Sequence, residues 1–366
     1  RGVLCWCAAR GQWCRIYVAL VRGSVPGHGR DARPAAVAPR VRTFAWTTRD
    51  AAVSITIGLD IGGTNIKGGV IDGNGAILAR GRRDTPAHDA SAIVEEAADL
   101  IRELSVAQKI DAVGVACAAY INRSGSLVFF SPNLAWRDEP LRERLRSAVD
   151  LPVMIENDAN AAAWGEFRFG AAIEVNDVVM LTVGTGLGGG VVVDGVLMRG
   201  AFGVAAELGH MRVVPDGLRC GCGNRGCWEQ YASGRALVRE ARELVASGTP
   251  HAARLNELCG GDPAALSGPD VTKAATEGDP AAVELLADLG TWIGEGAASV
   301  AAILDPELIV LGGGVSDAGA LLLDPAAAAF RRQLTGRGYR PEARFALAKL
   351  GNDAGMSGAA DLAARG

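Results

Sequence analysis

Three cysteines and one histidine provide the donor set of a zinc site. Cys220, Cys222 and Cys227 all lie in one glycine-rich segment of eight residues, and His210 precedes Cys220 by ten residues. Glycines let the backbone fold tightly enough to direct three sulfurs to one centre. Three thiolates and one imidazole fill a tetrahedral coordination sphere and leave no open position, which is typical of a structural zinc. Free thiols, or a disulfide that leaves one thiol over, are the alternatives.

Two glutamates flank this cluster. Glu207 lies three residues before His210, and Glu229 lies two residues after Cys227. A metal bound at the cluster would fix the backbone beside both carboxylates, which could then accept hydrogen bonds from neighbouring hydroxyl groups of a polyol. Because most glutamates lie on the protein surface, two solvent-exposed side chains remain the alternative at this point.

Two segments repeat a strand–turn–strand pattern with glycine and threonine in the turn. Residues 55–72 read ITIGLDIGGTNIKGGVID, and residues 178–195 read VVMLTVGTGLGGGVVVDG. Glycine has no Cβ, so backbone N–H groups in such a turn can approach a phosphate. One turn alone is weak evidence, since many hairpins contain glycine. The repetition indicates a duplicated domain, in which two turns facing each other across a cleft could bind the phosphates of one nucleotide.

Asn157 and Asp158 stand between a predicted strand, LPVMIE, and a run of strong helix formers. Asn is a favoured helix N-cap, so the pair is placed at the carboxyl end of a strand and the start of a helix. Open α/β sheets bind ligands at this position. Simple capping of the helix is the alternative.

Strand and helix patterns alternate through the rest of the chain, which predicts an α/β fold. At 366 residues the chain is long enough for two domains, which we place at residues 54–172 and 173–366. The last helix, at about residues 354–364, is expected to pack back on the first domain. Periodicity predicts helices over 91–105, 139–149, 230–246, 279–305 and 354–364, strands over 110–118, 306–314 and 343–351, and a loop over 250–270.

Residues 1–53 differ in composition from the rest. They contain nine arginines, no lysine and two aspartates, a net charge of +7, so residues 54–366 carry −11 of the total of −4. No strand or helix period persists there, and the first methionine of the chain is Met154. We therefore expect residues 1–53 to be a disordered or non-native extension and the working protein to begin near Val53.

Composition excludes several classes of function. Apolar residues make up 49% of the chain and charged residues 21%, as in ordinary globular proteins. No apolar run reaches the roughly 18 residues that would span a membrane, and the acidic body argues against a nucleic-acid partner. The scattered cysteines outside the cluster fit a reducing cytoplasm better than a disulfide framework.

Five motifs together resemble the ROK family of sugar kinases and repressors, and within it the ATP-dependent glucokinases of actinobacteria. They are LDIGGTNIKGG, ENDANAAAWGE, TVGTGLGGG, ELGH followed by CGCGNRGCWEQYASGRAL, and LGGGVS. The resemblance runs from about Ile55 to Ala364. It implies the actin-like ATPase fold, with two α/β domains around a cleft, and the cofactors ATP, Mg²⁺ and a structural Zn²⁺.

The resemblance also assigns roles to residues. Asp158 matches the catalytic base, which takes the proton of the sugar 6-hydroxyl as that oxygen attacks the γ-phosphate. The sugar-contacting positions match Asn133, Asn157, Asp158, Glu207, His210 and Glu229. The phosphate and Mg²⁺ region matches Asp60, Gly62, Gly63, Thr64, Lys67, Thr185 and Gly186, and the adenosine side matches Gly313 and Gly314. The zinc ligands match His210, Cys220, Cys222 and Cys227.

One departure concerns Ala119, where the family often has glycine; a methyl group there is expected to affect sugar affinity and not the reaction itself. Glucose is the expected substrate, and another hexose such as N-acetylmannosamine, N-acetylglucosamine or fructose is the alternative. A sugar-responsive repressor is less favoured because residues 1–53 show no helix-turn-helix pattern. Polyphosphate is the alternative phosphoryl donor. The resemblance further implies a dimer or tetramer that acts in the cytoplasm.

Overall fold

The computed structural model describes residues 2–7, 12–17 and 54–365, and the chain divides into two compact units, residues 1–51 and 52–366. The first unit contains a hairpin in which β1 (Gly2–Cys7) pairs antiparallel with β2 (Gln12–Tyr17). The sequence analysis did not predict these two strands, whose valine, isoleucine and aromatic residues favour strand formation. That residues 1–53 are a disordered or non-native extension stays a prediction. The predicted disorder of the remaining residues of 1–53 lies outside the described residues.

The first sheet of the second unit has five strands in the order β10-β6-β3-β4-β5. β3 pairs antiparallel with β4 and parallel with β6, which pairs parallel with β10. The apolar faces of α1 and α2 pack beside it, and the small sheet β7-β8-β9 follows β6 in the chain. The bounds are β3 Thr56–Ile61, β4 Asn65–Ile71, β5 Ile77–Asp84, α1 Ala90–Leu104, β6 Ala112–Cys117, β7 Tyr120–Ile121, β8 Val128–Phe130, β9 Arg137–Glu139, α2 Leu141–Val149 and β10 Val153–Asn157.

The second sheet repeats this arrangement in the order β13-β12-β11-β14-β15. β11 pairs antiparallel with β12 and parallel with β14, as β3 does with β4 and β6. The duplication predicted from the two glycine-rich segments is therefore confirmed in strand pairing. The bounds are α3 Asp158–Phe169, β11 Val178–Val183, β12 Leu187–Val193, β13 Val196–Leu197, β14 Leu308–Gly312 and β15 Arg344–Leu347.

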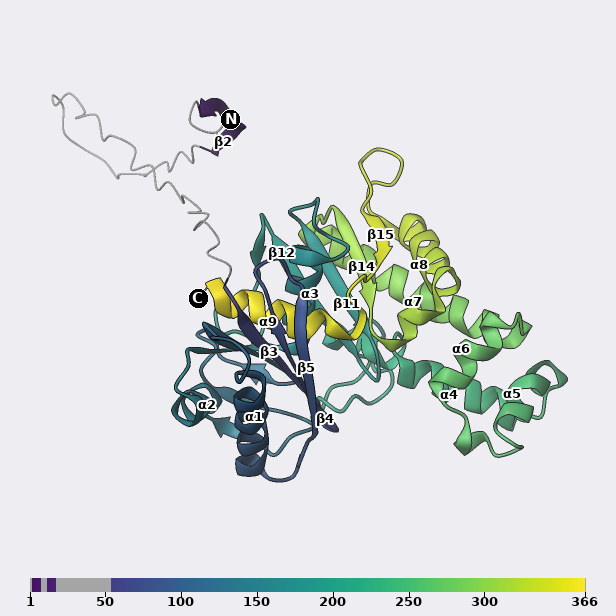
Figure 1. Ribbon diagram of the computed structural model, residues 1–366. Coiled ribbons are helices and arrows are strands. Elements are labelled where there is room, and N and C mark those ends of the chain that lie inside the picture. The colour runs from purple at the N-terminus through teal and green to yellow at the C-terminus, as the bar shows by residue number, and fades with distance from the viewer. Residues whose placement is uncertain (1, 8–11, 18–53, 366) are drawn as a thin grey trace, which may run out of the picture. The chain divides into compact units, whose positions relative to one another are not determined.

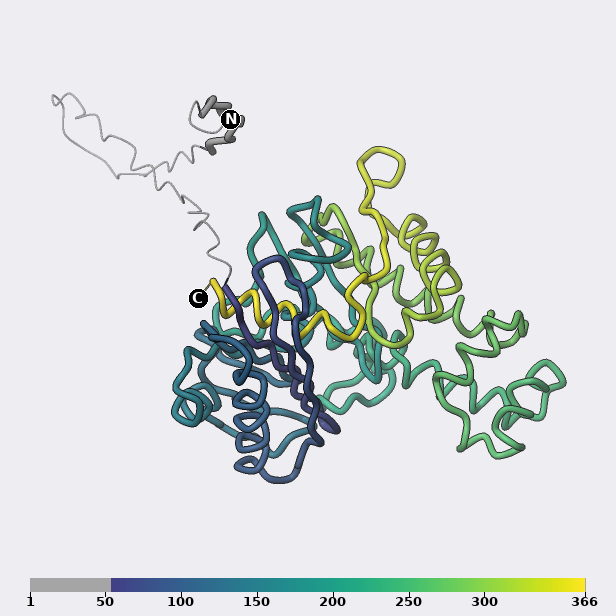
Figure 2. Tube along the Cα trace, viewed as in Figure 1, coloured from purple at the N-terminus to yellow at the C-terminus, as the bar shows by residue number. Residues whose placement is uncertain are grey.

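Two helices, α3 and α9 (Ala354–Arg365), lie side by side between strands of the two sheets. Figure 2 shows the yellow C-terminal end of the trace crossing the purple strands of the first sheet. A Cβ added at Gly58 of β3 or Gly114 of β6 would collide with the backbone of α9. Asp361 accepts hydrogen bonds from Trp164 Nε1 at 2.8 Å and Arg168 Nε at 3.2 Å, which fastens α9 to α3. The last helix thus packs on β3 and β6.

Three α-helices around the second sheet were not predicted from sequence periodicity. The segment 250–270, expected to be a loop, contains α5 (Ala253–Leu258) and the start of α6 (Gly268–Thr276). These helices are too short for a periodic pattern to stand out. A local capping box marks the start of α6, where Asp270 accepts from Ser267 N at 3.0 Å. α8 (Ala320–Gln333) was not predicted either.

The other elements predicted for this part of the chain are present with changed bounds. The strand predicted over 343–351 is the shortest relative to its prediction, because β15 spans only Arg344–Leu347 and a 3-10 helix begins at Gly351. α7 spans Pro280–Leu304. α4 spans Gly234–Ala246 and begins later than predicted, because Ser233 caps it by accepting from Ala236 N at 3.3 Å. Within the ranges that the structure describes, no helix has the length and apolar character needed to cross a membrane.

Candidate active site and metal centre

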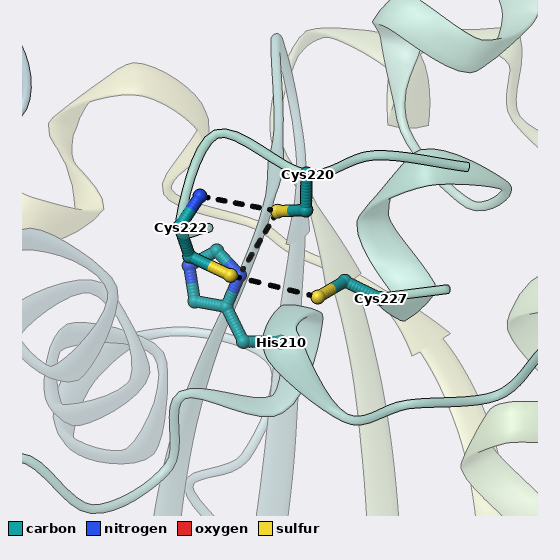
Figure 3. Close-up of side chains that lie close together, drawn as sticks. All are labelled: His210, Cys220, Cys222 and Cys227. Atoms are coloured by element: carbon teal, nitrogen blue, oxygen red, sulfur yellow. Dashed lines mark hydrogen bonds between the residues drawn. The ribbon is translucent and has the colours of Figure 1, made fainter. Parts of the chain in front are cut away.

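The four predicted zinc ligands come together in the structure (Figure 3). Their donor atoms all lie within 4.8 Å of one another. Cys222 Sγ lies 3.6 Å from Cys227 Sγ, and Cys220 Sγ lies 3.6 Å from His210 Nδ1. A tetrahedral zinc with bonds of about 2.3 Å to sulfur separates its donors by about 3.8 Å. The cluster therefore fits a zinc ion, and none of the cysteines with described side chains forms a disulfide.

Short helices position these ligands. His210 ends a 3-10 turn, Leu208–His210, and Cys227 precedes another, Trp228–Gln230. Arg212 and Cys227 form a β-bridge, and Trp228 N donates to Met211 O at 2.7 Å, so the two segments that carry His210 and Cys227 are tied together. Gly226, with φ of 71°, adopts a conformation that side chains rarely take.

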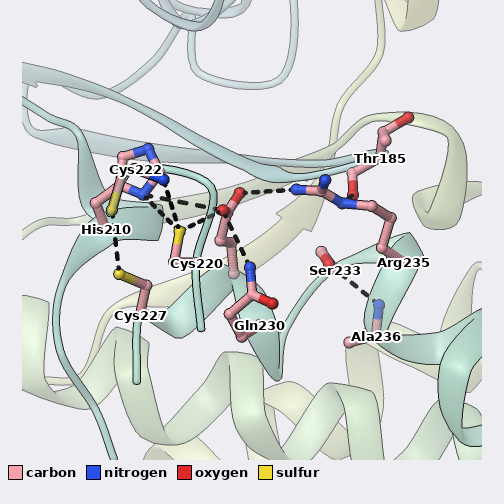
Figure 4. Close-up of polar contacts among 10 residues, drawn as sticks. Thr185, His210, Cys220, Cys222, Cys227, Gln230, Ser233, Arg235 and Ala236 are labelled. Carbon is pink, nitrogen blue, oxygen red and sulfur yellow. Dashed lines mark hydrogen bonds and ion pairs between the residues drawn. The ribbon is translucent and has the colours of Figure 1, made fainter. Parts of the chain in front are cut away.

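Glu229 connects this cluster to the second glycine-rich turn. Figure 4 shows Cys220 and His210 of the cluster, and Arg235 beside Thr185 of the turn. Glu229 Oε1 lies 2.9 Å from Cys220 Sγ, and Glu229 Oε2 lies 3.6 Å from an Arg235 guanidinium nitrogen. A Cβ built at Gly186 would lie 2.8 Å from Glu229 Oε2, so only glycine fits there without a shift. Arg235 Nε in turn donates to Thr185 O at 3.0 Å. The Glu229 carboxylate is thus buried beside both the metal cluster and the predicted phosphate turn.

Asn157 and Asp158 lie where β10 ends and α3 begins. Asn157 Oδ1 accepts from Asn160 N at 3.0 Å, so the predicted N-cap is confirmed. Its Nδ2 donates to Ala119 O at 3.3 Å, which ties the cap to the end of β6. Asp158 is the first helical residue, where the partial positive charge of the helix N-terminus favours a carboxylate. The cap at Asn157 therefore holds Asp158 in place. Capping by Asn157 leaves the Asp158 carboxylate available for a chemical role.

Negative charge accumulates around Asp158. Burial raises the pKa of the Asp158 carboxyl above its usual value. The pKa of Asp60 is raised to about 6, first by burial and then by the Asp158 charge, while Lys67 opposes the shift. The pKa of Glu207 is raised to about 7 by burial and by the charges of Asp158 and Glu229. Geometry agrees with this, since a Cβ built at Gly355 would lie 3.8 Å from Asp158 O and 3.9 Å from Asp60 Cγ. Carboxyls that are far apart in the sequence therefore lie near one another in the fold.

The raised pKa of Asp60 predicts a pH-dependent cost to stability. The folded carboxyl titrates near pH 6 and the unfolded one near 3.8, so the folded state binds more protons between these values and stability falls as pH rises through them. We expect Asp60→Asn to raise the free energy of unfolding by up to about 3 kcal/mol at pH 7.5 and by much less at pH 4.5. Urea unfolding without Mg²⁺ at both pH values measures this.

Asp216→Asn is the matched control, because Asp216 is exposed and its φ of 55° suits asparagine. It should change neither value by more than about 0.5 kcal/mol. If Asp60→Asn were instead less stable than the wild type at pH 7.5, the interpretation that the buried Asp60 carboxylate destabilises the folded state would be wrong.

A cavity of about 1150 Å³ opens beside the second turn. Gly184 and Thr185 of the turn, Gly314 after β14, and residues of α4 and α6 line it. Gly234 N donates to Gly184 O at 2.7 Å, so the start of α4 is fastened to the turn. The predicted residues Thr185 and Gly314 thus line the same cavity. Gly186 faces Glu229 instead. Gly313, with φ of 84°, packs against the backbone of Val183.

Sequence reasoning missed the basic residues of this cavity. They are Arg235, Arg239, Arg242 and Lys273. The first three recur at helical spacing on one face of α4, immediately after the glycine of SGRALVREAR, and this pattern was the available signal. In the first glycine-rich turn, Gly63 approaches Asn133, since a Cβ built at Gly63 would lie 3.4 Å from Asn133 Cβ. The neighbours in that first turn are Gly62 and Thr64, and Lys67 faces Asp60 across β3 and β4.

Comparison with known proteins identifies the family. The model of the ROK family matches residues 56–365. The chain belongs to the ROK family. A glucokinase of Streptomyces coelicolor is 49% identical over 312 residues, which cover 85% of this chain and 98% of that protein. A glucokinase of Halalkalibacterium halodurans is 36% identical over 82% of this chain and 92% of its own length.

A solved structure of a ROK family glucokinase from Streptomyces griseus, in complex with glucose and AMPPNP, is similar in fold. It has a TM-score of 0.78 and 50% sequence identity, and the match covers 86% of this chain and 100% of that one. Together with the two repeated sheets, this likeness confirms the actin-like ATPase fold that the ROK motifs implied. The cluster of His210 and three cysteines, Asp158 and both glycine-rich turns all lie within the ROK match.

Proposed function

We propose that this protein is an ATP-dependent glucokinase that transfers the γ-phosphate of ATP to the 6-hydroxyl of glucose. The observation that carries the proposal is the position of Glu229, which contacts the metal cluster on one side and the second glycine-rich turn on the other. A sugar bound by the carboxylates beside the cluster would therefore lie next to a nucleotide bound at that turn. The 49% identity to a Streptomyces glucokinase over most of the chain supports glucose as the acceptor.

Asp158 is the proposed general base. Its carboxylate, half-buried at the start of α3, would accept the proton of the 6-hydroxyl as that oxygen attacks the γ-phosphate. Asn133, Asn157, Glu207, His210 and Glu229 are the proposed contacts to the remaining hydroxyl groups. Carboxylates surrounded by protein accept such hydrogen bonds strongly because the local dielectric is low. Most of the catalytic effect is expected from holding the two substrates in line.

The nucleotide is proposed to lie in the cavity beside α4 and α6, with its phosphates toward the two turns. Thr185 and Gly186 of one turn and Gly63 and Thr64 of the other would supply backbone N–H groups. Gly62, whose N donates to Asn65 O at 3.0 Å, would hold the shape of its turn beside the phosphates. Gly313 and Gly314 would border the adenosine. Asp60 is the proposed anchor of Mg²⁺, whose chemistry here is to neutralise charge on the transferred phosphate. Lys67 lies beside Asp60 and would assist it.

The zinc ion is proposed to be structural, held by His210, Cys220, Cys222 and Cys227. Its role would be to hold the segments that carry Glu207 and Glu229, since those residues neighbour the ligands in sequence. We also propose a division into two α/β domains near residue 172, action in the cytoplasm, and assembly as a homo-oligomer of two or four copies.

A coupled assay of ADP release, with ATP and Mg²⁺ and a panel of hexoses, tests the substrate. We expect glucose to give the highest kcat/KM, ahead of mannose, fructose, N-acetylglucosamine and N-acetylmannosamine. If another hexose is preferred, the proposed mechanism stands and the proposed substrate is wrong. Ala119, whose carbonyl accepts a hydrogen bond from Asn157, would then be the first position to substitute. Turnover with polyphosphate and not with ATP would replace the donor. Absence of turnover with every sugar in zinc-loaded protein would contradict the proposed enzyme.

A further inference from the structure

Glu156 is a buried carboxylate directly before the proposed sugar and base residues, and it has no assigned role. It is 4% exposed and occupies the penultimate position of β10. Its Oε1 accepts from Asn157 N at 3.0 Å and from Asn160 Nδ2 at 3.1 Å. Through these two bonds, the carboxylate contacts Asn157, directly before Asp158, and Asn160, in the first turn of α3 after it. The backbone geometry at the start of α3 therefore depends on Glu156.

The other oxygen of Glu156 reaches a distant part of the chain. Oε2 accepts from Arg199 Nε at 2.6 Å, and the side chains of Glu156 and Arg199 are only 5% and 26% exposed. A buried carboxylate without a cationic partner would be costly, so the two groups depend on each other. Such a pair contributes little net stability compared with apolar packing. This favours a role in positioning the two segments that the pair joins over a role in stabilising the fold.

Arg199 belongs to the loop that leads to the other half of the sugar site. Ala205 N donates to Arg199 O at 3.2 Å, which closes the loop at residues 199–205. Gly203, with φ of 96°, packs against the backbone of Ile121 and Arg123, so the tip of the loop is held as well. Glu207 follows two residues after the closed loop. Fixing Arg199 thus fixes the approach of the chain to Glu207 and His210.

We propose that the Glu156–Arg199 ion pair is a positioning device that sets Asp158 relative to the sugar-contacting segment Glu207–His210. The inference rests on the proposed kinase function. The pair touches neither the nucleotide cavity nor the zinc ligands. Its loss should therefore misalign the base and the sugar hydroxyl while ATP and zinc still bind.

Three variants test this: Glu156→Gln, Arg199→Gln and the double variant. Each single change should lower kcat for glucose about tenfold or more, since small misplacement of reacting groups has large effects, and should change the KM for ATP less than about twofold. Because both changes remove the same interaction, the double variant should be no worse than the less active single variant. The matched control is Glu139→Gln, which removes another buried carboxylate paired with an arginine, Arg144 at 2.8 Å.

Hydrogen exchange measured by mass spectrometry gives a second readout that needs no turnover. Either single variant should raise exchange both at residues 157–160 and at residues 200–210, whereas Glu139→Gln should raise it at neither. Unchanged kcat in folded, zinc-loaded variants, additive losses in the double variant, or exchange that rises at only one of the two segments would overturn the proposal. If the wild type phosphorylates no hexose, the kinase proposal fails, and the exchange pattern still decides whether the pair couples the two segments.

Discussion

Asp158→Asn is expected to lower kcat for glucose phosphorylation by about 10³-fold, because loss of a general base typically costs 10²- to 10⁴-fold. Glucose affinity should change by no more than about threefold, since the amide keeps the size of the carboxyl and still accepts a hydrogen bond. The fold should persist, because Asn157 and not Asp158 caps α3. Steady-state kinetics, together with a direct measurement of glucose binding, separates the two effects.

The same substitution has an electrostatic consequence that a simple loss of structure would not produce. The Asp158 charge contributes to the raised pKa of both Asp60 and Glu207. Its removal should lower both pKa values, so the residual activity should extend to lower pH than that of the wild type. An unchanged acidic limb would show that the groups controlling that limb are not coupled to Asp158.

Asp150→Asn provides the control for Asp158→Asn. Asp150 is an exposed aspartate that ends α2 with φ of 54°, a conformation that asparagine accepts. Its kcat should remain within about twofold of the wild type. Retention of more than about a tenth of wild-type kcat in Asp158→Asn would contradict the role of base, and loss of glucose binding would make Asp158 a binding residue instead.

Cys222→Ser is expected to release zinc and abolish most activity. Metal bound by a site of this kind contributes its binding free energy to folding, and the site carries His210, which is both a ligand and a proposed sugar contact. Without the ion, the segment between His210 and Cys227 would lose the cross-link that positions Glu229. We expect zinc content to fall from about one ion per chain to a small fraction and kcat/KM for glucose to fall about 10²-fold or more.

Elemental analysis of the purified variant, thermal unfolding and kinetics measure these three effects. Cys259→Ser is the matched control, because Cys259 is a buried thiol outside the cluster whose Sγ donates to Asn256 O at 3.3 Å, a bond that serine can also make. It should retain its zinc and its activity. A fully active wild type without zinc, or a Cys222→Ser variant with full zinc content, would be incompatible with the proposed metal site.

Features that depend on nearby residues were predictable from the amino-acid pattern. The cap at Asn157, the glycine-rich turns and the closely spaced cysteines are local, because hydrogen bonds and ligand geometry within a few residues determine them. Long periodic elements such as α7 were predictable for the same reason. Short helices such as α5 were missed, since six residues hold too little periodicity to distinguish a helix from a loop.

The sequence by itself therefore determined the family, the repeated strand–turn–strand plan and the zinc donor set, each of which is encoded in contiguous residues. Only the tertiary structure placed Glu229 against Gly186, joined Glu156 to Arg199 and gathered the basic residues of α4 and α6 around one cavity. The raised pKa values of Asp60 and Glu207 arise in the same way. Burial and charge proximity depend on which distant segments pack together, and no local pattern records that packing.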